Sequence, residues 1–422
     1  MSKQSTDAFG APRGTRDLLP PGSWGWQRVT RYALDAFALA GYAPIETPMF
    51  EHTEVFERGV GATSEVVGKQ MYTFTDRGGR SLTLRPEGTA PVVRAVLENN
   101  LHRGALPVKL SYASAMFRQE RPQKGRYRQF FQLGIEAIGS DEPTVDAEVI
   151  EVAVRFYAGI GLDVSTRINS IGHLDESCRL GYTRVLREFL TAHEGDLAEE
   201  DRERIGTNPM RSFDSKEEKT ITVMKDAPLI TEHLCPSCRD HYISVKELLD
   251  AVEIGYEEEP RLVRGLDYYT RTAFEFVAGG LGSQDAVGGG GRYDGLAEVL
   301  GGPHVPGIGF ALGLDRIMLS LGSEAAEPTV RIAAYIVALG ADATKSAFPL
   351  ATRLRAAGIG TELDVMGRGM KGQMKDADRS GARYAVILGD EEMAAGEATV
   401  KDLTTGDQER CPIDQLGERL AR

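Results

Sequence analysis

Apolar residues recur along the first part of the chain with the periods of helices and strands. A helix is predicted over residues 23–40, because Val29, Ala33 and Phe37 fall on one face and Gly41 supplies a stop. Two aromatic and aliphatic runs, 108–117 and 129–138, predict a pair of strands around a polar turn. Shorter strands are expected at 44–50, 81–85 and 163–168, and helices from about 89 to 100 and from 141 or 144 onward.

The pattern changes twice further along the chain. From about 169 to 260 it is charged and helical, which indicates an inserted helical module. Strands return at 271–277 and near 307, and an apolar helix ends at 321. The chain is therefore predicted to hold an α+β domain in two parts, 1–168 and 261–322, a module at 169–260 and a linker at 323–330. Residues 331–422 alternate strand and helix, which predicts a separate small α/β domain.

Composition restricts the kind of protein without identifying it. The chain has 422 residues, of which 41% are hydrophobic and 26% charged, as in ordinary globular proteins. Its net charge of −13 means that a nucleic acid must be held by local basic patches. No apolar run approaches the roughly 20 residues that span a bilayer, and the N-terminus lacks the apolar core of a signal peptide. With only four cysteines, a reduced, cytoplasmic setting and no membrane partner are expected.

The turn between the two long strands is strongly basic. It runs from 118 to 128, with Pro122 and Gly125 as turn residues and Glu120 as its only acid. Its five cations are Arg118, Arg121, Lys124, Arg126 and Arg128. Guanidinium groups pair with phosphate oxygens through two hydrogen bonds, so the turn suits a polyanion. The alternative is a solvated hairpin tip.

Other polar groups occupy positions that suit a cleft. Glu87 and Thr89 lie at a predicted strand-to-helix corner, where Glu87 could instead cap the helix. Gln132 and Glu136 are four residues apart, so they share one face of their strand.

Two arginines further along the chain also indicate an anion. Arg264 lies in the segment 262–270, LVRGLDYYT. Arg316 lies in an otherwise apolar helix, where it requires either an anion or a structural salt bridge. These distant segments carry polar groups that can converge on one site.

Together the segments resemble the motifs of class II aminoacyl-tRNA synthetases, and within that class the histidyl-tRNA synthetase family. The first helix and the Pro48 strand are similar to the first class motif, which forms a dimer, and Pro48 places that strand at an edge or an interface. FRQE at 117–120 is similar to the second motif, and GFALGLDR at 309–316 to the third. LVRGLDYYT and GGGRYDGL at 289–296 resemble the two histidine-specific segments. The resemblance spans nearly the whole chain. It implies a mostly antiparallel catalytic sheet flanked by helices, with a C-terminal α/β anticodon-binding domain.

The resemblance implies ATP-dependent ligation of L-histidine to tRNA(His) through a histidyl-adenylate. The amino acid's carboxylate attacks the α-phosphorus, so the site needs cations more than a base. By resemblance, Arg118 contacts the α-phosphate, Arg264 lies opposite it, and Arg316 contacts the terminal phosphate. Glu120 is implied to bind the adenine amino group, and Phe130 is placed to stack on the base. Mg²⁺ should bridge the ATP phosphates, leaning on the nucleotide more than on protein ligands. No organic cofactor and no protein-bound metal are expected there.

The histidine side of the implied site uses a second set of residues. Glu87, Thr89 and Gln132 would hold the ammonium group, and Arg264 would lie near the carboxylate. An imidazole offers one donor and one acceptor, or two donors when charged, and Glu136 and Tyr269 can satisfy both ring nitrogens. The walls would be Tyr268 and Tyr293. Such a site rejects wrong side chains without a separate editing module.

Partners follow from the same resemblance. The tRNA is expected to contact the basic turn at Arg121, Lys124 and Arg126. The anticodon would be read by Arg368, Lys371, Lys375 and Arg379, of which the last three follow a four-residue spacing along one helix face. A homodimer is expected. The alternatives are a non-catalytic regulatory subunit of ATP phosphoribosyltransferase and a class II synthetase of another specificity. Arginines at 118, 264 and 316 and the long C-terminal tail argue against the first.

Two further motifs stay outside this assignment. His233, Cys235, Cys238 and His241 have zinc-like spacing, but four ligands so close in sequence would strain one tetrahedron. Ordinary reduced cysteines are expected, and whether this group ever binds a metal is left open. Cys178 and Cys411 carry no discernible chemistry. The glycine run 288–291 lacks the features of a phosphate-binding loop, so it is expected to let backbone approach substrate closely and to lead into a helix from Tyr293.

Overall fold

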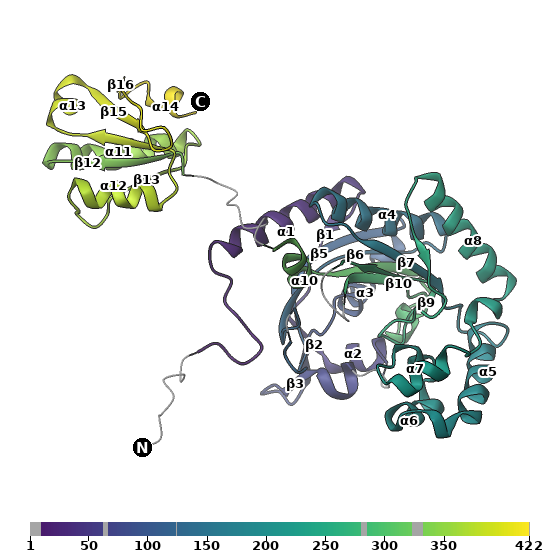
Figure 1. Cartoon of the computed structure of the whole chain (residues 1–422). Coiled ribbons are helices and arrows are strands. Elements are labelled where there is room, and N and C mark those ends of the chain that lie inside the picture. Colours follow the sequence, from purple (N-terminus) through teal and green to yellow (C-terminus); the bar gives the residue numbers. More distant parts are fainter. Residues whose placement is uncertain (1–9, 62–65, 124, 280–284, 323–331, 422) are drawn as a thin grey trace, which may run out of the picture. The chain divides into compact units, whose positions relative to one another are not determined.

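The computed structural model describes residues 10–61, 66–123, 125–279, 285–322 and 332–421 (Figure 1). The chain divides into two compact units, over residues 1–327 and 328–422. Each unit has its own sheet and its own core.

The first unit is built on an eight-stranded sheet of order β1-β5-β6-β11-β10-β9-β7-β8. Its strands are β1 (Ala43–Pro44), β5 (Val108–Phe117), β6 (Gln129–Ile138), β7 (Ser165–Ser170), β8 (Glu257–Glu258), β9 (Thr270–Val277), β10 (Ala286–Arg292) and β11 (Gly307–Gly313). The six inner strands are antiparallel to their neighbours, whereas the edge strands β1 and β8 pair in parallel. The expected mostly antiparallel α+β sheet is therefore confirmed.

Helices cover both faces of this sheet (Figure 1). One core joins α1 (Gly22–Leu39), α4 (Pro143–Gly159) and α8 (Pro236–Ala251) to odd-numbered β6 residues such as Leu133 and Ile135. The other joins α3 (Thr89–Glu98) to β5. Since strand side chains alternate between faces, even-numbered β6 residues point toward α3.

The sequence predictions for this unit hold for the long elements and fail at proline and glycine. The strands 108–117 and 129–138 have the predicted ends. Residues 44–50 do not form one strand: only Ala43–Pro44 pair with β5, and β2 (Phe50–His52) belongs to a separate sheet of order β2-β4-β3, because the segment between them holds Pro48. The glycine run 288–291 lies inside strand β10, and the next helix, α9 (Leu296–Val299), is one turn long.

The remaining elements of the first unit are shorter. The three-stranded sheet is completed by β3 (Tyr72–Thr75) and β4 (Ser81–Leu84), beside α2 (Thr53–Gly59) and the short helices η1 (Val66–Gln70) and η2 (Leu101–Arg103). The charged segment after β7 is helical as predicted, with α5 (Arg179–Ala192), η3 (Glu194–Asp196), α6 (Glu199–Thr207), η4 (Pro209–Asp214), α7 (Glu218–Met224) and η5 (Ile230–Glu232) before α8. α10 (Leu314–Leu321) follows β11 directly.

The second unit has a five-stranded sheet of order β13-β12-β14-β15-β16. The predicted alternation is confirmed in β12 (Ala334–Ala338), α11 (Ala341–Ala356), β13 (Thr361–Leu363), α12 (Met370–Arg379) and β14 (Tyr384–Leu388). α11 packs against one face and α12 against the other, with separate cores. The sequence analysis missed α13 (Asp390–Ala395), the antiparallel strands β15 (Glu397–Asp402) and β16 (Gln408–Pro412), and α14 (Leu416–Leu420). The expected linker 323–330 lies outside the described residues.

No helix among the described residues combines the length and the apolar character needed to cross a membrane.

Candidate active site

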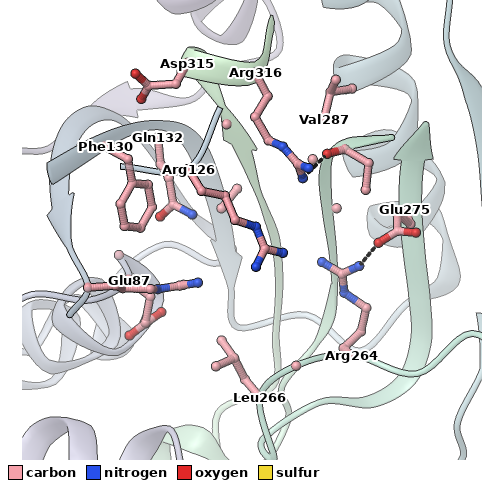
Figure 2. A pocket seen from close by; sticks show the side chains of 18 of the residues that line it. Glu87, Arg126, Phe130, Gln132, Arg264, Leu266, Glu275, Val287, Asp315 and Arg316 are labelled. Carbon is pink, nitrogen blue, oxygen red and sulfur yellow. Dashed lines mark hydrogen bonds and ion pairs between the residues drawn. The ribbon is translucent and has the colours of Figure 1, made fainter. Parts of the chain in front are cut away.

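A cavity of about 390 Å³ opens on the face of the large sheet that carries α3. Its lining residues come from the β4–α3 corner, the turn between β5 and β6, β6, the segment before β9, β9, β10, β11 and the start of α10. Figure 2 shows Arg126, Arg264 and Arg316 directed toward the same space, with Phe130 and Gln132 beside them. The three distant polar segments identified in the sequence thus converge on one site.

Strand alternation and glycine give this cavity its depth. Phe130, Gln132 and Glu136 are even-numbered residues of β6, so they lie on the cavity face of the strand. The register places Glu136 opposite Gly309 of β11, where an added Cβ would lie 1.9 Å from the carboxylate. On β6 itself, a Cβ at Gly134 would lie 2.1 Å from the ring of Tyr112. The glycines in these strands leave room for large polar side chains beneath the cavity.

The carboxyl group of Glu136 is completely buried at the base of the site. It accepts hydrogen bonds from Tyr293 Oη at 2.6 Å, Thr89 Oγ1 at 2.7 Å and Tyr112 Oη at 3.3 Å. Burial raises the pKa of Glu136 to about 8, although the bonds from Tyr293 and Thr89 oppose the shift. The free site therefore holds a carboxyl group that is mostly protonated at neutral pH.

Glu87 performs both of the roles that its position allows. Its two oxygens accept the backbone N–H groups of Thr89 at 2.7 Å and Ala90 at 3.0 Å, so it caps the start of α3. The same carboxyl group lines the cavity and accepts a hydrogen bond from Tyr268 Oη at 3.3 Å. Burial raises the pKa of Glu87 above its usual range.

Among the described residues, five guanidinium groups line the cavity, those of Arg118, Arg126, Arg211, Arg264 and Arg316. Arg118 donates from Nε to the carbonyl oxygen of Pro86 at 2.9 Å and lies 5.1 Å from the ring of Phe130. The pKa of Arg316 is lowered, first by burial and then by the charge of Arg126. So many cations in one cavity repel one another, and a polyanion bound among them would relieve this repulsion.

Arg264 is held in place from two sides. Its Nη1 is 3.0 Å from a carboxylate oxygen of Glu275, as the dashed line in Figure 2 marks. Its guanidinium lies over Gly289, where an added Cβ would approach the Nη atoms to 2.7–2.8 Å. The glycine run thus brings a side chain close to the strand, not only a substrate. Among the described residues, the buried Nε of Arg264 and the buried Oε1 of Gln132 have no hydrogen-bond partner, and both residues line the cavity.

All four carboxylates that line the cavity are already engaged by protein groups. Glu87 accepts backbone N–H groups, Glu120 lies 3.5 Å from Arg126, Glu275 pairs with Arg264, and Asp315 lies 2.7 Å from Arg16. A divalent cation in this cavity would therefore depend mostly on oxygens that a ligand brings with it.

The predicted site residues fall into groups by their position. Those that line the cavity are Glu87, Thr89, Arg118, Glu120, Arg126, Phe130, Gln132, Arg264, Tyr268, Tyr269 and Arg316. Glu136 and Tyr293 do not line the cavity. Glu136 accepts hydrogen bonds from the lining residue Thr89 and from Tyr293. Arg121 is exposed on the basic turn, and Lys124 lies outside the described residues.

The four cations predicted to read the anticodon lie on α12 or just before it. Lys371 and Lys375 are exposed. Arg368 and Arg379 are also exposed, but both form ion pairs with Asp376. Two of the four charges are thus partly offset within the helix.

Several cavity residues escaped the sequence analysis. Arg211 comes from the helical module and donates to the carbonyl oxygen of Gly265. Nothing in the local pattern of the module marks it. Glu275 had a usable signal, because it is a charged residue between two buried phenylalanines of β9. Tyr112, which does not line the cavity but donates to Glu136 behind it, is hidden in an ordinary strand pattern.

The structure does not bring the four candidate ligands within 233–241, His233, Cys235, Cys238 and His241, together at one point. His241 Nε2 lies 3.1 Å from Asp146, inside a buried network with Arg292. His233 stacks on Tyr182 with 5.5 Å between ring centroids. Only Cys235 and Cys238 of that set approach each other, with the Cys238 backbone N–H donating to Cys235 Sγ at 3.4 Å.

Comparison with known proteins agrees with this geometry. Residues 14–317 match the family model of histidyl-tRNA synthetase, and residues 333–422 match an anticodon binding domain. A histidine--tRNA ligase of Halothermothrix orenii is 48% identical over 98% of this chain and 99% of its own length. A histidine--tRNA ligase of Rhodococcus erythropolis is 50% identical over 100% of this chain and 99% of its own length. The solved apo histidyl-tRNA synthetase of S. aureus superposes with a TM-score of 0.82 at 38% identity, over 98% of this chain and 99% of that one. A Bacillus halodurans structure described as an ATP phosphoribosyltransferase regulatory subunit/histidyl-tRNA synthetase shares the fold alone, at 24% identity and a TM-score of 0.66, over 90% of this chain and 98% of that one.

Proposed function

Because the chain belongs to the histidyl-tRNA synthetase family, we propose that it is the ligase that joins L-histidine to tRNA(His), with ATP as co-substrate. The carboxylate of histidine attacks the α-phosphorus and pyrophosphate leaves. A hydroxyl of the terminal ribose of the tRNA then attacks the adenylate carbonyl and AMP leaves. The regulatory alternative is not favoured, because full-length relatives at about half identity are histidine--tRNA ligases.

The observation that carries the proposal is the division of the cavity into a cationic end and a buried carboxyl end. Arg118, Arg126 and Arg316 suit the phosphates of ATP, which arrive with their Mg²⁺ because the carboxylates of the cavity are engaged. Phe130 would stack on adenine, and Glu120 would accept a hydrogen bond from the adenine amino group. Arg126, expected from the sequence to meet tRNA, is better placed for ATP, since it lines the cavity.

At the buried carboxyl end of the cavity, histidine would bind to atoms that lack hydrogen-bond partners in the free protein. The ammonium group would meet Gln132 Oε1, Thr89 and Glu87, and the carboxylate would meet Arg264 Nε. The imidazole ring would pass Tyr268 to reach Glu136 and Tyr269. The catalytic cations are thus Arg118 and Arg264, on opposite sides of the reacting α-phosphate.

ATP–pyrophosphate exchange measured with each amino acid tests this proposal. Exchange should require histidine, because its ring offers both a donor and an acceptor to the buried end of the site, whose polar groups a wrong side chain would leave unpaired. A regulatory protein would give no exchange with any amino acid. A synthetase of another specificity would give exchange with a different one.

Substitution of Glu136 by glutamine should weaken the binding of histidine more than the binding of ATP. The loss of a charge-assisted hydrogen bond corresponds to about 1.5–3 kcal/mol, or roughly 10- to 150-fold in the histidine KM. The pH profile gives a sharper result. If ring and carboxyl share one proton in the complex, the free site must take up a proton above pH 8, where Glu136 has lost its own. Wild-type affinity should therefore fall above pH 8.

The glutamine variant is its own control for this pH profile. The ammonium group of free histidine loses its proton at the same pH whichever protein is present. If the affinity for histidine falls above pH 8 to the same extent in the variant, the fall does not come from Glu136. An unchanged histidine KM and turnover number in the variant would make Glu136 a purely structural residue.

We further propose a homodimer formed through the region of residues 24–48. Strand β1 is an open edge of the large sheet, and Leu39 at the end of α1 is 91% exposed. Met49 and Phe50, just after this region in the sequence, are exposed apolar side chains as well. Sedimentation velocity at micromolar concentration should give the mass of two chains, and Leu39→Glu should shift the protein toward one. A wild-type monomer would contradict the proposal.

The proposed setting and division of labour follow from the substrates. We place the enzyme in the cytoplasm, with residues 1–168 and 261–322 as its catalytic domain, 169–260 as the inserted module and 331–422 as the anticodon-binding domain. The exposed Arg121 would contact tRNA near the catalytic domain.

A further inference from the structure

Three cysteines and a histidine from separate parts of the chain meet at the base of the helical module. The donor atoms of His173, Cys178, Cys235 and Cys238 all lie within 4.8 Å of one another. His173 Nδ1 is 2.9 Å from Cys238 Sγ and 3.6 Å from Cys235 Sγ. We propose that this cluster binds one structural Zn²⁺ through three thiolates and one imidazole, a function separate from the chemistry of the active site.

The donor set is that of a closed zinc site. Three cysteines and one histidine are among the common ligand sets of structural zinc, with Zn–S near 2.3 Å and Zn–N near 2.0–2.1 Å. In a tetrahedron with those bond lengths the donors lie about 3.5–3.8 Å apart. The donors here need to move by about an ångström at most to reach such a geometry, since none is more than 4.8 Å from another. All three cysteines are buried, so the site leaves no open position for a substrate.

The local backbone favours a thiolate at Cys235. Cys235 is the N-cap of α8, a 16-residue helix, and its Sγ accepts the N–H of Cys238. A helix N-terminus and a backbone N–H both stabilise a negative sulfur. Gly172 precedes His173 with φ +65°, and a Cβ there would lie 2.6 Å from Cys178 Sγ. The turn is therefore shaped around the sulfur.

The cluster joins segments that are far apart in sequence. His173 and Cys178 lie in the connection between β7 and α5, and Cys235 and Cys238 begin α8, about 60 residues later (Figure 1). The same connection is bonded to the histidine-specific segment, because the Arg271 N–H donates to Gly172 O at 2.9 Å and Arg179 Nη1 donates to Tyr269 O at 2.5 Å. A metal here would fix the helical module to the segment that carries Tyr269.

Metal analysis of the untagged full-length protein, after dialysis against metal-free buffer, tests the proposal. We expect about one zinc per chain, bound by three sulfurs and one nitrogen in X-ray absorption spectra. Loss of zinc to a strong chelator should lower the melting temperature, and added Zn²⁺ should restore it. Wild-type protein that holds no zinc and takes none up after reduction would overturn the proposal. So would a disulfide between any two of the three cysteines in freshly purified protein, or a zinc bound only by nitrogen and oxygen.

Matched variants assign the ligands. Cys178→Ser and His173→Ala should each lose most of the zinc. Cys411→Ser, which changes a buried cysteine of the second unit, and His233→Ala, which changes a histidine close in sequence to the cluster, should keep it. Equal loss of zinc in the Cys411 variant would overturn the assignment. If the cluster variants do not fold, the stoichiometry and the sulfur count of the wild type still decide the question.

Discussion

Replacement of Arg264 by alanine is expected to lower ATP–pyrophosphate exchange by about 10²–10³ while the fold stays intact. Arg264 is a preformed cation in the cavity, with Nη1 bound to Glu275 and a buried Nε that has no partner among the described residues. In the proposed reaction, negative charge develops on the α-phosphate as the histidine carboxylate attacks. A fixed guanidinium at that point lowers the barrier because it need not reorganise. Turnover should fall more than ATP affinity, since other arginines hold the phosphates.

Two controls separate loss of the cation from other effects. Arg261→Ala changes an exposed arginine three residues away whose side chain donates to the backbone carbonyl oxygens of Met224 and Lys225, and should leave exchange unchanged. The alanine at 264 also leaves Glu275 facing the phosphates without its partner. The double variant Arg264→Ala/Glu275→Gln removes that repulsion. If the double variant recovers full exchange, the defect comes from the unpaired carboxylate, and Arg264 has no catalytic role.

Removal of residues 331–422 should spare histidine-dependent exchange and abolish most tRNA charging. The chain divides into two compact units, and the second has its own sheet and two cores, so the first should fold alone. All residues proposed to bind ATP and histidine lie in the first unit. The chain as a whole is acidic, so tRNA must be gripped at local basic surfaces, and α12 provides one. The measurement compares exchange and charging rates for the two proteins.

A charge reversal in the complete chain provides the matched control for this truncation. Lys371 and Lys375 are exposed, whereas Arg368 and Arg379 pair with Asp376, so the lysines carry the charge most available to phosphate. Lys371→Glu/Lys375→Glu should weaken charging and reduce its salt dependence without changing exchange. Equal loss of exchange and charging on truncation would mean that the second unit supports the catalytic fold. Unchanged charging would mean that it does not read tRNA.

Elements defined by long, regular patterns were predictable from the sequence. The ends of β5 and β6 were given correctly because ten residues of apolar and aromatic character leave little choice of structure. The prediction of one strand over residues 44–50 was wrong because the pairing of this segment depends on a distant strand, β5, and on Pro48. Strand β10 was not predicted at the glycine run, because glycine in a strand gives no local signal. The close approach of Arg264 to Gly289 was also not predicted, because Arg264 comes from another part of the chain.

The candidate site shows the same division. Residues inside recognisable motifs, such as Arg118 and Arg316, were found and do line the cavity. Arg211 was missed because the short helix η4 in a charged module brings it there through tertiary contacts alone. The cysteine and histidine cluster was only half visible for a similar reason. Two of its members are close in sequence, and the other two join them through the fold.

The glycines beneath the cavity also determine which positions of this protein are able to change over time. Gly134, Gly289 and Gly309 do not have positive φ angles, so their backbones would accept any residue. An added Cβ would nevertheless lie 2.1, 2.7 and 1.9 Å from the side chains of Tyr112, Arg264 and Glu136. Even alanine is therefore excluded while those partners remain. At Gly134 the three nearest atoms all belong to Tyr112, so a change at this site is coupled to the tyrosine. At Gly289 and Gly309 a Cβ would also lie 2.7 Å from the carbonyl oxygen of Phe274 and 2.3 Å from that of Ile135, so these two sites require glycine even where the neighbouring side chain changes.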